Sequence, residues 1–498
     1  MRTNRVCRLA GCLTVLLVAL PVEAAQFHIT PDGTPKGKGS RTEPWDLATG
    51  LNAADVVKPG DTVWIHAGIY RGGFTSRLAG TAENPVVVRG AEGERVTIDT
   101  LPRDERDNSL FSIVGADTIY RDFEVMCSDT LRKTKIPGPW PADIRRGNVN
   151  VRADRVSLVN LVLHDLDCGV GFWSEGEGGE ISGCLIYNNG WTGPDREHGH
   201  GIYAQNARGT KLISNNFVFH QFGYGMQIYG SSKASIKGFE IVGNVAFMNG
   251  CMKPPLAPSN GIMVGGESPA ERILVQDNVV VGGGIRLGYP WGTTNSDIVC
   301  TGNYSDGGLV VRDFRKATVS KNTVIASSTV VSLEGAAGVL LNGHRWAEND
   351  YYMTDGRWGE CSIVEHGKSR GATFAQWQKE LGLDSTSKFT KGLPTNGRVI
   401  IRPNAHEKGR ANIVILNPAG SPEVPVSLSS VLENGQAFRI VSVKDYYGPA
   451  LVSGIYRGED VSIPMKPIAG TPPIGMPDEK LPVTEPHFGA FVVLPGGR

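Results

Sequence analysis

The residues best suited to chemistry lie at 193–206, where the sequence reads Gly-Pro-Asp-Arg-Glu-His-Gly-His-Gly-Ile-Tyr-Ala-Gln-Asn. Asp195, Glu197, His198 and His200 combine carboxyl and imidazole groups that can exchange protons near neutral pH. A weaker version of the segment, Gly-Tyr-Gly-Met-Gln-Ile-Tyr, follows at 223–229. Glycines punctuate both segments, which indicates loops that lead into short strands. We therefore expect a ligand site built from loops around this stretch.

The His-x-His pair within this stretch has more than one interpretation. His198 and His200 share parity with Ile202, so a strand extended backwards would bury both as structural hydrogen-bonding groups. The intervening glycines argue against such an extension. A His-x-His pair also suits a metal ion, with Glu197 or Asp195 as a further ligand. The metal ligands are therefore unassigned, and a divalent cation such as calcium stays open as a cofactor.

The scaffold that must position these groups is repetitive. Short runs rich in Val and Ile recur from about residue 85 onward, and they alternate rather than follow a helical period. One register aligns a polar residue before each run: Asn160, Cys184, Asn216, Asn244, Asn278, Asn303 and Asn322. A second, interleaved register aligns the first inward residue of another strand: Val149, Val170, Ile202, Met226, Ile262, Ile285 and Leu309. Two interleaved registers predict an all-β parallel β-helix solenoid with a buried asparagine ladder.

Alternation along the second set of strands predicts which side chains face solvent. The exposed row is Asn148, Asn150, Trp173, Tyr203, Gln205, Gln227, Tyr229, Met263, Arg286 and Arg312. Aromatic rings pack on sugar faces, and amide and guanidinium groups bond hydroxyls or carboxylates. An ordinary exposed β-face is the alternative interpretation. The predicted substrate-binding residues are Trp173, Gln205, Tyr224, Gln227, Tyr229 and Lys253.

Loop lengths place the site at one corner of the coils. The connection takes six residues from His164 to Val170 and from His220 to Met226, but fourteen from Asn188 to Ile202 and from Met248 to Ile262. Two insertions on either side of a short connection predict two walls above one floor. The first wall adds Trp191 and Arg196 to the acidic and imidazole groups, the second offers Lys253 and Asn260, and the floor offers His220, Gln221 and Tyr224. His164 and His220 occupy corresponding corner positions, so both also suit stacked turn residues.

The two ends of the chain differ from the repeats. Three arginines and an apolar run predict a signal peptide over residues 1–24, which indicates a secreted or periplasmic protein. The β-helix, with a helical cap around 46–57, is expected over 25–345. A connecting segment over 346–395 contains a short helix at 373–382 with a capping box. Residues 396–498 are expected to form a small β-sandwich-like domain.

Composition excludes several classes of function. Lys plus Arg and Asp plus Glu number 50 each, so the chain lacks the basic excess of a nucleic-acid-binding protein. No segment after the signal is long and apolar enough for a membrane span. Six cysteines follow residue 24, which allows fifteen disulfide pairings among which spacing does not choose, and no CxxC motif indicates zinc.

The interleaved coils, the export signal and the capping segment resemble the right-handed parallel β-helix superfamily of pectate-lyase-like proteins, over about residues 26–342. The resemblance implies activity on polysaccharides by lyases, glycoside hydrolases or uronan epimerases. The Val-Trp-Ile-His run at 63–66 lacks the Asp of a pectate lyase motif. Gly199-His200-Gly201 resembles the polygalacturonase element without its Asp-Asp pair, and the epimerase Asp-Pro-His-Asp motif is absent. No subfamily's catalytic residues are therefore carried over.

The leading hypothesis is a polysaccharide lyase that acts on an acidic glycan by β-elimination. Arg286, a bound cation or the His cluster would neutralise the carboxylate, with His200 or Tyr203 as base and Tyr229 or His220 as acid. One alternative is a glycoside hydrolase whose two carboxylates come from the set Asp165, Asp167, Glu175, Asp195 and Glu197. The other is a non-catalytic glycan-binding protein that uses Trp173, Tyr203 and Tyr229.

Overall fold

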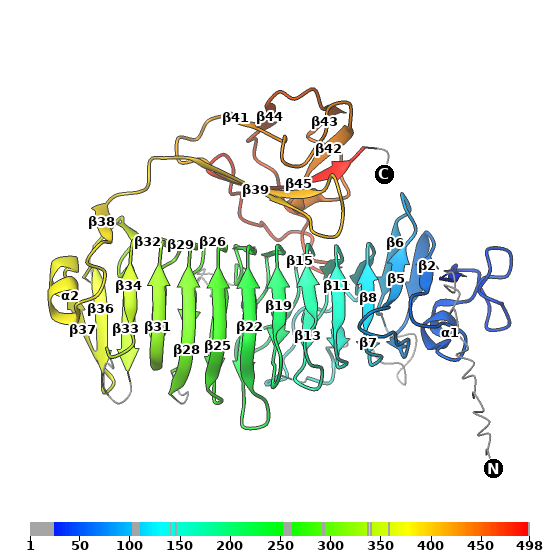
Figure 1. Cartoon of the computed structure of the whole chain (residues 1–498), viewed down its shortest axis with the longest axis horizontal. Coiled ribbons are helices and arrows are strands. Elements are labelled where there is room, and N and C mark those ends of the chain that lie inside the picture. Colours follow the sequence, from blue (N-terminus) through cyan, green and yellow to red (C-terminus); the bar gives the residue numbers. More distant parts are fainter. Residues whose placement is uncertain are drawn as a thin grey trace, which may run out of the picture.

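The computed structural model describes residues 24–101, 110–139, 141–144, 147–251, 261–290, 294–335, 338, 341–356 and 359–496. The chain winds into a solenoid in which each coil contributes one strand to each of three long sheets (Figure 1). All neighbouring strands within these sheets are parallel except the last pair of sheet C, so the predicted parallel β-helix is confirmed. The resulting cylinder has one apolar core and three outer faces.

Sheet A contains the first strand of each coil. Its order is β1 (Gln26–Ile29), β2 (Thr62–Ile65), β5 (Val86–Gly90), β8 (Thr118–Arg121), β11 (Val156–Val159), β14 (Glu180–Ser182), β19 (Lys211–Ser214), β22 (Ile236–Val242), β25 (Ala270–Gln276), β28 (Asn295–Thr301), β31 (Phe314–Ser320) and β34 (Arg345–Ala347).

Sheet B follows sheet A after a tight bend in each coil. Its order is β3 (Gly68–Arg71), β6 (Val96–Asp99), β9 (Glu124–Met126), β12 (Val162–His164), β15 (Leu185–Tyr187), β20 (Phe217–Phe219), β23 (Val245–Phe247), β26 (Val279–Val281), β29 (Tyr304–Asp306), β32 (Thr323–Ala326), β35 (Asp350–Met353) and β38 (Lys388–Lys391).

Sheet C closes each coil and carries the candidate site. Its order is β4 (Phe74–Ser76), β7 (Phe111–Ile113), β10 (Val149–Val151), β13 (Val170–Phe172), β18 (Ile202–Ala204), β21 (Met226–Gly230), β24 (Ile262–Gly266), β27 (Ile285–Leu287), β30 (Leu309–Arg312), β33 (Val331–Gly335), β36 (Cys361–Glu365) and the antiparallel β37 (Lys368–Ala372).

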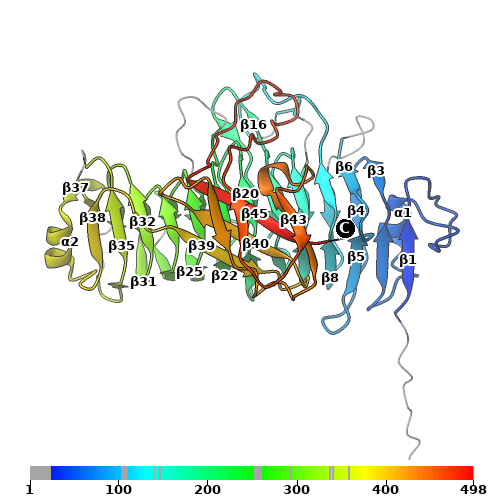
Figure 2. The same ribbon diagram turned by 90° about the horizontal axis from the view of Figure 1, so that it is seen from above.

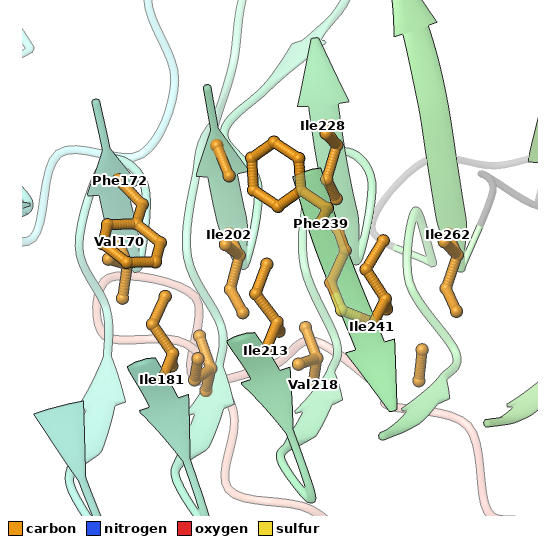
Figure 3. Close-up of a cluster of buried hydrophobic side chains, with 14 of the residues drawn as sticks. Val170, Phe172, Ile181, Ile202, Ile213, Val218, Ile228, Phe239, Ile241 and Ile262 are labelled. Atoms are coloured by element: carbon orange, nitrogen blue, oxygen red, sulfur yellow. The ribbon is translucent and has the colours of Figure 1, made fainter. Parts of the chain in front are cut away.

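The register of sheet C agrees with the prediction. Val149 pairs with Val170, Val170 with Ile202, and Ile202 with Met226, and the series continues through Ile262. These side chains are fully buried. They stack from coil to coil inside the solenoid, as Val170, Ile202 and Ile262 do in Figure 3. Alternation therefore fixes which residues of this sheet point outward.

The asparagine ladder lies at the bend between sheets A and B. Each side-chain oxygen from Asn244 onward accepts hydrogen bonds from the Asn of the preceding coil, at 2.9–3.0 Å from its Nδ2. The members are Asn216, Asn244, Asn278, Asn303, Asn322 and Asn349. Asn160 was wrongly assigned to this series. Val162 pairs with Leu185, so Leu161 is the residue that corresponds to Cys184 at the ladder position. Asn160 lies one residue before that position, in a left-handed conformation with φ +53°.

Both ends of the solenoid carry short helices. Helix α1 (Leu47–Asn52) is shorter than predicted and is capped by Asp46. Helix α2 (Phe374–Leu381) has the expected capping box at Thr373, and Gly382 ends it at φ +66°. The solenoid runs beyond the predicted boundary at 345, because β35, β36 and β38 still belong to sheets B and C. These later strands escape the pattern because they carry few Val and Ile residues.

The C-terminal region forms a sandwich-like unit of two sheets. The larger has the order β39 (Arg398–Pro403), β40 (Ala411–Leu416), β45 (Phe488–Pro495), β42 (Ala437–Ser442) and β43 (Val452–Ile455), and the smaller pairs β41 (Glu423–Val426) with β44 (Val461–Pro464). A 3-10 turn spans Val443–Asp445. The unit packs on the outer face of sheet B, where Phe217 and Phe247 meet Val414 and Phe488 (Figure 1).

The six cysteines after residue 24 are all free thiols, and five of them are buried. No disulfide therefore constrains the described structure. Within the described ranges, the structure contains no helix with the length and apolar character of a membrane span.

Candidate functional site

The candidate site lies on the outer face of sheet C, where two rows of side chains run along the solenoid. The first row contains Asn150, Gly171, Tyr203, Gln227, Met263 and Arg286, which are consecutive partners in the register. The second row contains Trp173, Gln205 and Tyr229, two residues further along their strands. Neither row contains a carboxylate between Trp173 and Arg286. The prediction that Asn150, Gln205, Gln227 and Met263 are exposed is wrong, because all four are buried, so the accessible groups of the face are mainly the aromatic rings and Arg286.

Four aromatic rings form a continuous series across these rows. The ring centroids are 5.5 Å apart for Trp173 and Tyr203, 6.3 Å for Tyr203 and Tyr229, and 5.2 Å for Tyr229 and Tyr289. The Trp173 indole donates a hydrogen bond to Asn150, which fixes its orientation. Tyr289 was missed by sequence reasoning because it lies beyond the end of β27, where alternation no longer determines direction. The structure thus joins three predicted aromatics with a fourth.

His200 lies beside this series but is oriented as a donor. Its Nδ1 accepts the backbone N–H of Tyr224 at 3.1 Å, so the remaining proton is assigned to Nε2. Burial lowers the pKa of His200 to about 3, the charges of Arg196 and His198 add to this effect, and the side chain of Gln227 opposes it. A neutral imidazole whose lone pair is already used cannot accept a proton. The hydrogen bonding therefore argues against the predicted base role of His200.

The first insertion is an ordered hairpin in which β16 (Trp191–Thr192) pairs with β17 (Glu197–His198). The rings of Trp191 and His198 stack at 3.9 Å, and Asp195 Oδ1 lies 3.2 Å from His198 Nε2. Glu197 accepts a hydrogen bond from the Thr192 hydroxyl at 2.7 Å. Gly199, at φ +93°, ends β17 before His200, so the two histidines are not neighbours on one extended strand. The hairpin occupies the position predicted for the first wall.

His220 does not belong to this face. Its ring packs against Phe219 and Phe247 of sheet B, with centroids 5.2 and 5.9 Å away, and it is almost completely buried. Burial lowers its pKa to about 3, with the charge of Lys444 as a second cause. The left-handed corner at φ +53° directs the side chain toward the C-terminal unit. The predicted role of His220 as an acid is therefore wrong. Its expected equivalence to His164 is also wrong, because Asp165 holds that corner position.

Arg286 is the cation of this face. Among the described residues it forms no ion pair with a carboxylate, and its buried Nε has no hydrogen-bond partner. Arg312, further along the sheet, is instead paired with Glu334. Arg286 and Arg196 both act electrostatically on the phenol of Tyr289, which places the hairpin and the face within electrostatic reach of one point. Lys253 and Asn260, predicted for the second wall, lie outside the described residues.

The tyrosines of the face are protonated at neutral pH. Burial raises the pKa of Tyr203 to about 12, and the neighbouring phenol of Tyr229 contributes. Burial also raises the pKa of Tyr229, together with Tyr289 and Glu267. A phenol with a raised pKa carries its proton at neutral pH but is a weaker acid than an unperturbed phenol, and it becomes a base only in alkaline solution.

The five carboxylates considered for hydrolysis already have partners. Asp165 pairs with Arg132 and His164, and Glu175 pairs with Arg152. Asp167 accepts the Trp191 indole N–H at 2.9 Å. Asp195 and Glu197 are engaged within the hairpin, as described above. A pair of free carboxylates around a common cleft is therefore not formed by these five residues.

A second polar cluster, missed from the sequence, lies at the edge of the covered face of sheet B. His164 bridges Glu124 at 2.9 Å and Asp165 at 2.7 Å. Burial alone would lower the pKa of His164, but the two carboxylates raise it to about 9. Arg95 also pairs with Glu124 at 2.9 Å. This cluster is internally satisfied and borders a cavity of about 530 Å³ that Thr471 and Ile474 also line. Its residues come from the adjacent coils of β6, β9 and β12, the last of which also carries Trp173, and sequence periodicity gave no signal that they meet.

The described side chains do not form a metal site. Across the described ranges, no group of three or more His, Cys, Asp or Glu side chains is arranged to hold a metal ion. His198 and His200 have separate partners, so the His-x-His pair does not converge on one point.

Comparison with known proteins agrees with this architecture. The family described as right handed beta helix region matches residues 143–301. A solved rhamnogalacturonan lyase is similar over 68% of this chain and 84% of its own, with 14% identity and a TM-score of 0.45. A pectate lyase matches over 76% and 80%, with 13% identity and a TM-score of 0.41.

A third solved structure, the GH136 lacto-N-biosidase from Eubacterium ramulus, matches over 74% and 67%, with 14% identity and a TM-score of 0.40. No curated protein sequence is significantly similar to the chain. At these identities and TM-scores the structural matches carry no further argument. The sheet topology and the family match lead to the same conclusion: this chain is a right-handed parallel β-helix protein that carries a C-terminal β-sandwich-like unit.

Proposed function

We propose that the protein binds an acidic polysaccharide along the outer face of sheet C and cleaves it by β-elimination. The observation that carries the proposal is the aromatic series from Trp173 to Tyr289 beside Arg286, a cation without a carboxylate partner among the described residues. Aromatic faces take up sugar rings, and a guanidinium group recognises a carboxylate. The similar lyases and glycosidase carry no argument about activity, so the proposal depends on these side chains.

The spacing of the face suits a polymer that runs along the solenoid. Successive coils of a β-helix are about 4.8 Å apart, close to the length of one sugar unit. The ring centroids of the series are separated by 5.2–6.3 Å, a spacing similar to one sugar unit, although the coil of β24 contributes no ring. Gln205 and Gln227 belong to the same two rows, but both amides are buried and Gln205 Nε2 donates to the Tyr229 carbonyl at 3.3 Å, so the rings are the main contacts for sugar.

The chemical step assigns roles to four residues. Arg286 lies three strands along the face from Tyr203, where it binds a carboxylate of the polymer and adds positive charge to the face on which negative charge develops when C5 loses its proton. Tyr203, as phenolate, removes that proton, and the electron pair forms the C4–C5 double bond while the C4–O bond breaks. Tyr229, which is protonated, gives its proton to the leaving oxygen. His200 serves as a hydrogen-bond donor through Nε2.

One observation favours a second candidate, a glycan-binding protein without turnover. Burial raises the pKa of Tyr203 to about 12, and the lone pair of His200 is occupied. The face therefore offers no strong base near neutral pH, while its aromatic series remains able to bind.

A panel of uronate-containing and neutral polysaccharides tests both candidates. The lyase predicts products that absorb in the ultraviolet through their new double bond, with rates that rise between pH 7 and pH 10. Binding to acidic polymers without such products at any pH supports the second candidate. Failure to bind any acidic polymer contradicts both, and new reducing ends without ultraviolet absorbance would favour a hydrolase.

We also propose that the protein is exported. The arginines before the apolar run at residues 9–20 and the small residues at 22–24 support this proposal. Sequencing the N-terminus of protein recovered outside the cytoplasm tests it, with Ala25 expected as the first residue.

A further inference from the structure

The C-terminal unit reaches the corner from which the two insertions emerge. We call residues 470–482 the C-terminal strap. The strap leaves the sandwich and crosses the solenoid beside β16 (Figure 2). Gly470 lies against the His220 ring, and the Thr471 carbonyl accepts a hydrogen bond from Asn188 Nδ2 at 2.8 Å. The strap is therefore in contact with corner residues of successive coils.

The centre of the strap is held through both backbone groups of one residue, Ile474. The Ile474 N–H donates to Asp165 Oδ1 at 2.8 Å, and its carbonyl accepts from Arg132 Nε at 3.0 Å. Arg132 and Asp165 are both almost fully buried and form an ion pair with each other. Because buried charged groups are costly to separate, these bonds hold the strap at a defined position.

Arg132 also connects the strap to the first insertion. Its guanidinium donates to the carbonyl of Gly190, where that insertion begins, and lies 5.2 Å from the centre of the Phe222 ring. The backbone of Arg132 accepts a hydrogen bond from Thr192 of β16 at 2.8 Å. The hairpin of the first wall and the strap therefore share one buried side chain.

The apolar side of the strap contacts the floor and the second insertion. Met476 and Phe222 are buried together, with Cys251 and Leu481 packed against them. Phe222 belongs to the short floor corner, and Cys251 lies within the connection that carries the second insertion. One methionine side chain thus fills the space behind both.

We propose that the strap is a positioning element for the glycan site. Met476 holds Phe222 of the floor corner, which lies against Gly190 at the start of the hairpin, and Arg132 holds the hairpin through the Gly190 carbonyl. This inference rests on the proposed function for its biological consequence. The hairpin consists of two two-residue strands, too few for independent order, so contacts from outside must offset its conformational entropy. The C-terminal unit therefore shapes the first wall and the floor in addition to covering sheet B.

Two methionine variants of the full chain separate positioning from general stability. Met476→Ala removes the strap contact, and Met465→Ala removes the same side chain from the interior of the sandwich, where Met465 is 1% exposed. Amide hydrogen exchange is measured over residues 190–200 and over β40, without any glycan.

We expect Met476→Ala to accelerate exchange of the hairpin by about tenfold or more while exchange of β40 is unchanged, and Met465→Ala to show the reverse. Met476→Leu, which conserves volume, should restore the wild-type rate. Equal hairpin exchange in the two alanine variants would overturn the inference.

An activity measurement then tests the consequence for the site. On an acidic polysaccharide, Met476→Ala should raise KM more than it lowers kcat, and Met465→Ala should change neither when assayed well below its Tm. Hydrogen exchange is measured without glycan, so it tests the strap independently of the proposed function. A wild-type protein that neither binds nor cleaves any acidic polymer would contradict the proposed function, and the exchange result would still test the role of the strap. An unchanged KM in Met476→Ala together with accelerated exchange would show that hairpin order does not limit binding.

Discussion

The outer faces of sheets B and C have the same backbone geometry but differ in their side chains and in how far they are exposed to solvent. On sheet B the middle coils present Val162, Phe217 and Phe247, which the C-terminal unit covers. On sheet C the corresponding coils present Trp173, Tyr203 and Arg286, which stay partly exposed. Ionic groups differ in the same way, since His164 on sheet B bridges two carboxylates while Arg286 has no carboxylate partner among the described residues.

This difference separates stability from function on one scaffold. Groups on sheet B have their partners within the chain, so their interactions contribute to folding. Groups on sheet C keep unsatisfied bonding capacity, for which a ligand is the natural partner. Substitutions on the two faces should therefore have different signatures, and the four predictions below are ordered by the size of the expected effect.

The largest effect is expected for Tyr203→Phe. Loss of the phenol should lower kcat by about 10²–10⁴-fold, because a positioned proton-transfer group contributes that much. The wild-type rate should rise about tenfold per pH unit above neutrality, since the base form of Tyr203 is populated only as the pH approaches its pKa of about 12. Kinetics from pH 7 to 10 measure both. Tyr352→Phe, on sheet B, is the matched control and should retain full activity. A mutant as active as wild type would remove Tyr203 from the mechanism.

Phe247→Ala tests the covered face. Phe247 stacks on Phe219 at 4.7 Å and meets Phe488 at 5.2 Å, so its loss leaves a cavity at the interface with the C-terminal unit. The free energy of unfolding should fall by about 3–5 kcal/mol, as for other buried Phe→Ala changes. Denaturant unfolding measures it. Val299→Ala, at a side chain that is 39% exposed, should change it by less than about 0.5 kcal/mol. Equal losses in the two variants would contradict the assigned role of the interface.

Much of this contrast was predictable. Alternation of Val and Ile gave the register of sheet C, so Tyr203, Gln227 and Tyr229 were correctly placed on one outer face. Periodicity reports only the direction of a side chain along a strand. It distinguishes the faces of a sheet from the core, and it does not say what covers a face.

The sequence-based predictions fail where contacts with distant parts of the chain determine the environment of a side chain. His220 was misplaced because residues about 250 positions later, around Gly470, bury it. Asn160 was misassigned because a left-handed turn residue and a ladder asparagine have the same side chain. His200 has the predicted location, but its tautomer depends on the backbone N–H of Tyr224. Local sequence carries no information about such partners.

Arg286→Gln tests the charge on the open face. Removing the guanidinium should weaken binding of acidic polymers by about 10–100-fold, because hydrogen bonds to charged groups contribute about 1.5–3 kcal/mol. Thermal stability should be unchanged or slightly higher, since Arg286 has no carboxylate partner in the described part of the chain. Calorimetry with an acidic and a neutral oligosaccharide measures the difference. Arg272→Gln, on sheet A, is the control of equal charge. Equal losses for both sugars would show that Arg286 does not read a carboxylate.

The smallest effect is expected for Trp173→Ala, at the first ring of the series. Trp173 contacts Tyr203 on one side only, with Arg152 5.5 Å from its ring centre, so a polymer can still bind the remaining three rings. Affinity should fall about tenfold for long oligosaccharides and less for short ones that need not reach this coil. Because the ring is partly exposed, Tm should drop far less than in Phe247→Ala. Titrations with oligosaccharides of increasing length measure this dependence. A loss of affinity that is independent of length would mean that sugars do not follow the solenoid axis, and a loss of stability equal to that of Phe247→Ala would mean that the open face is also structural.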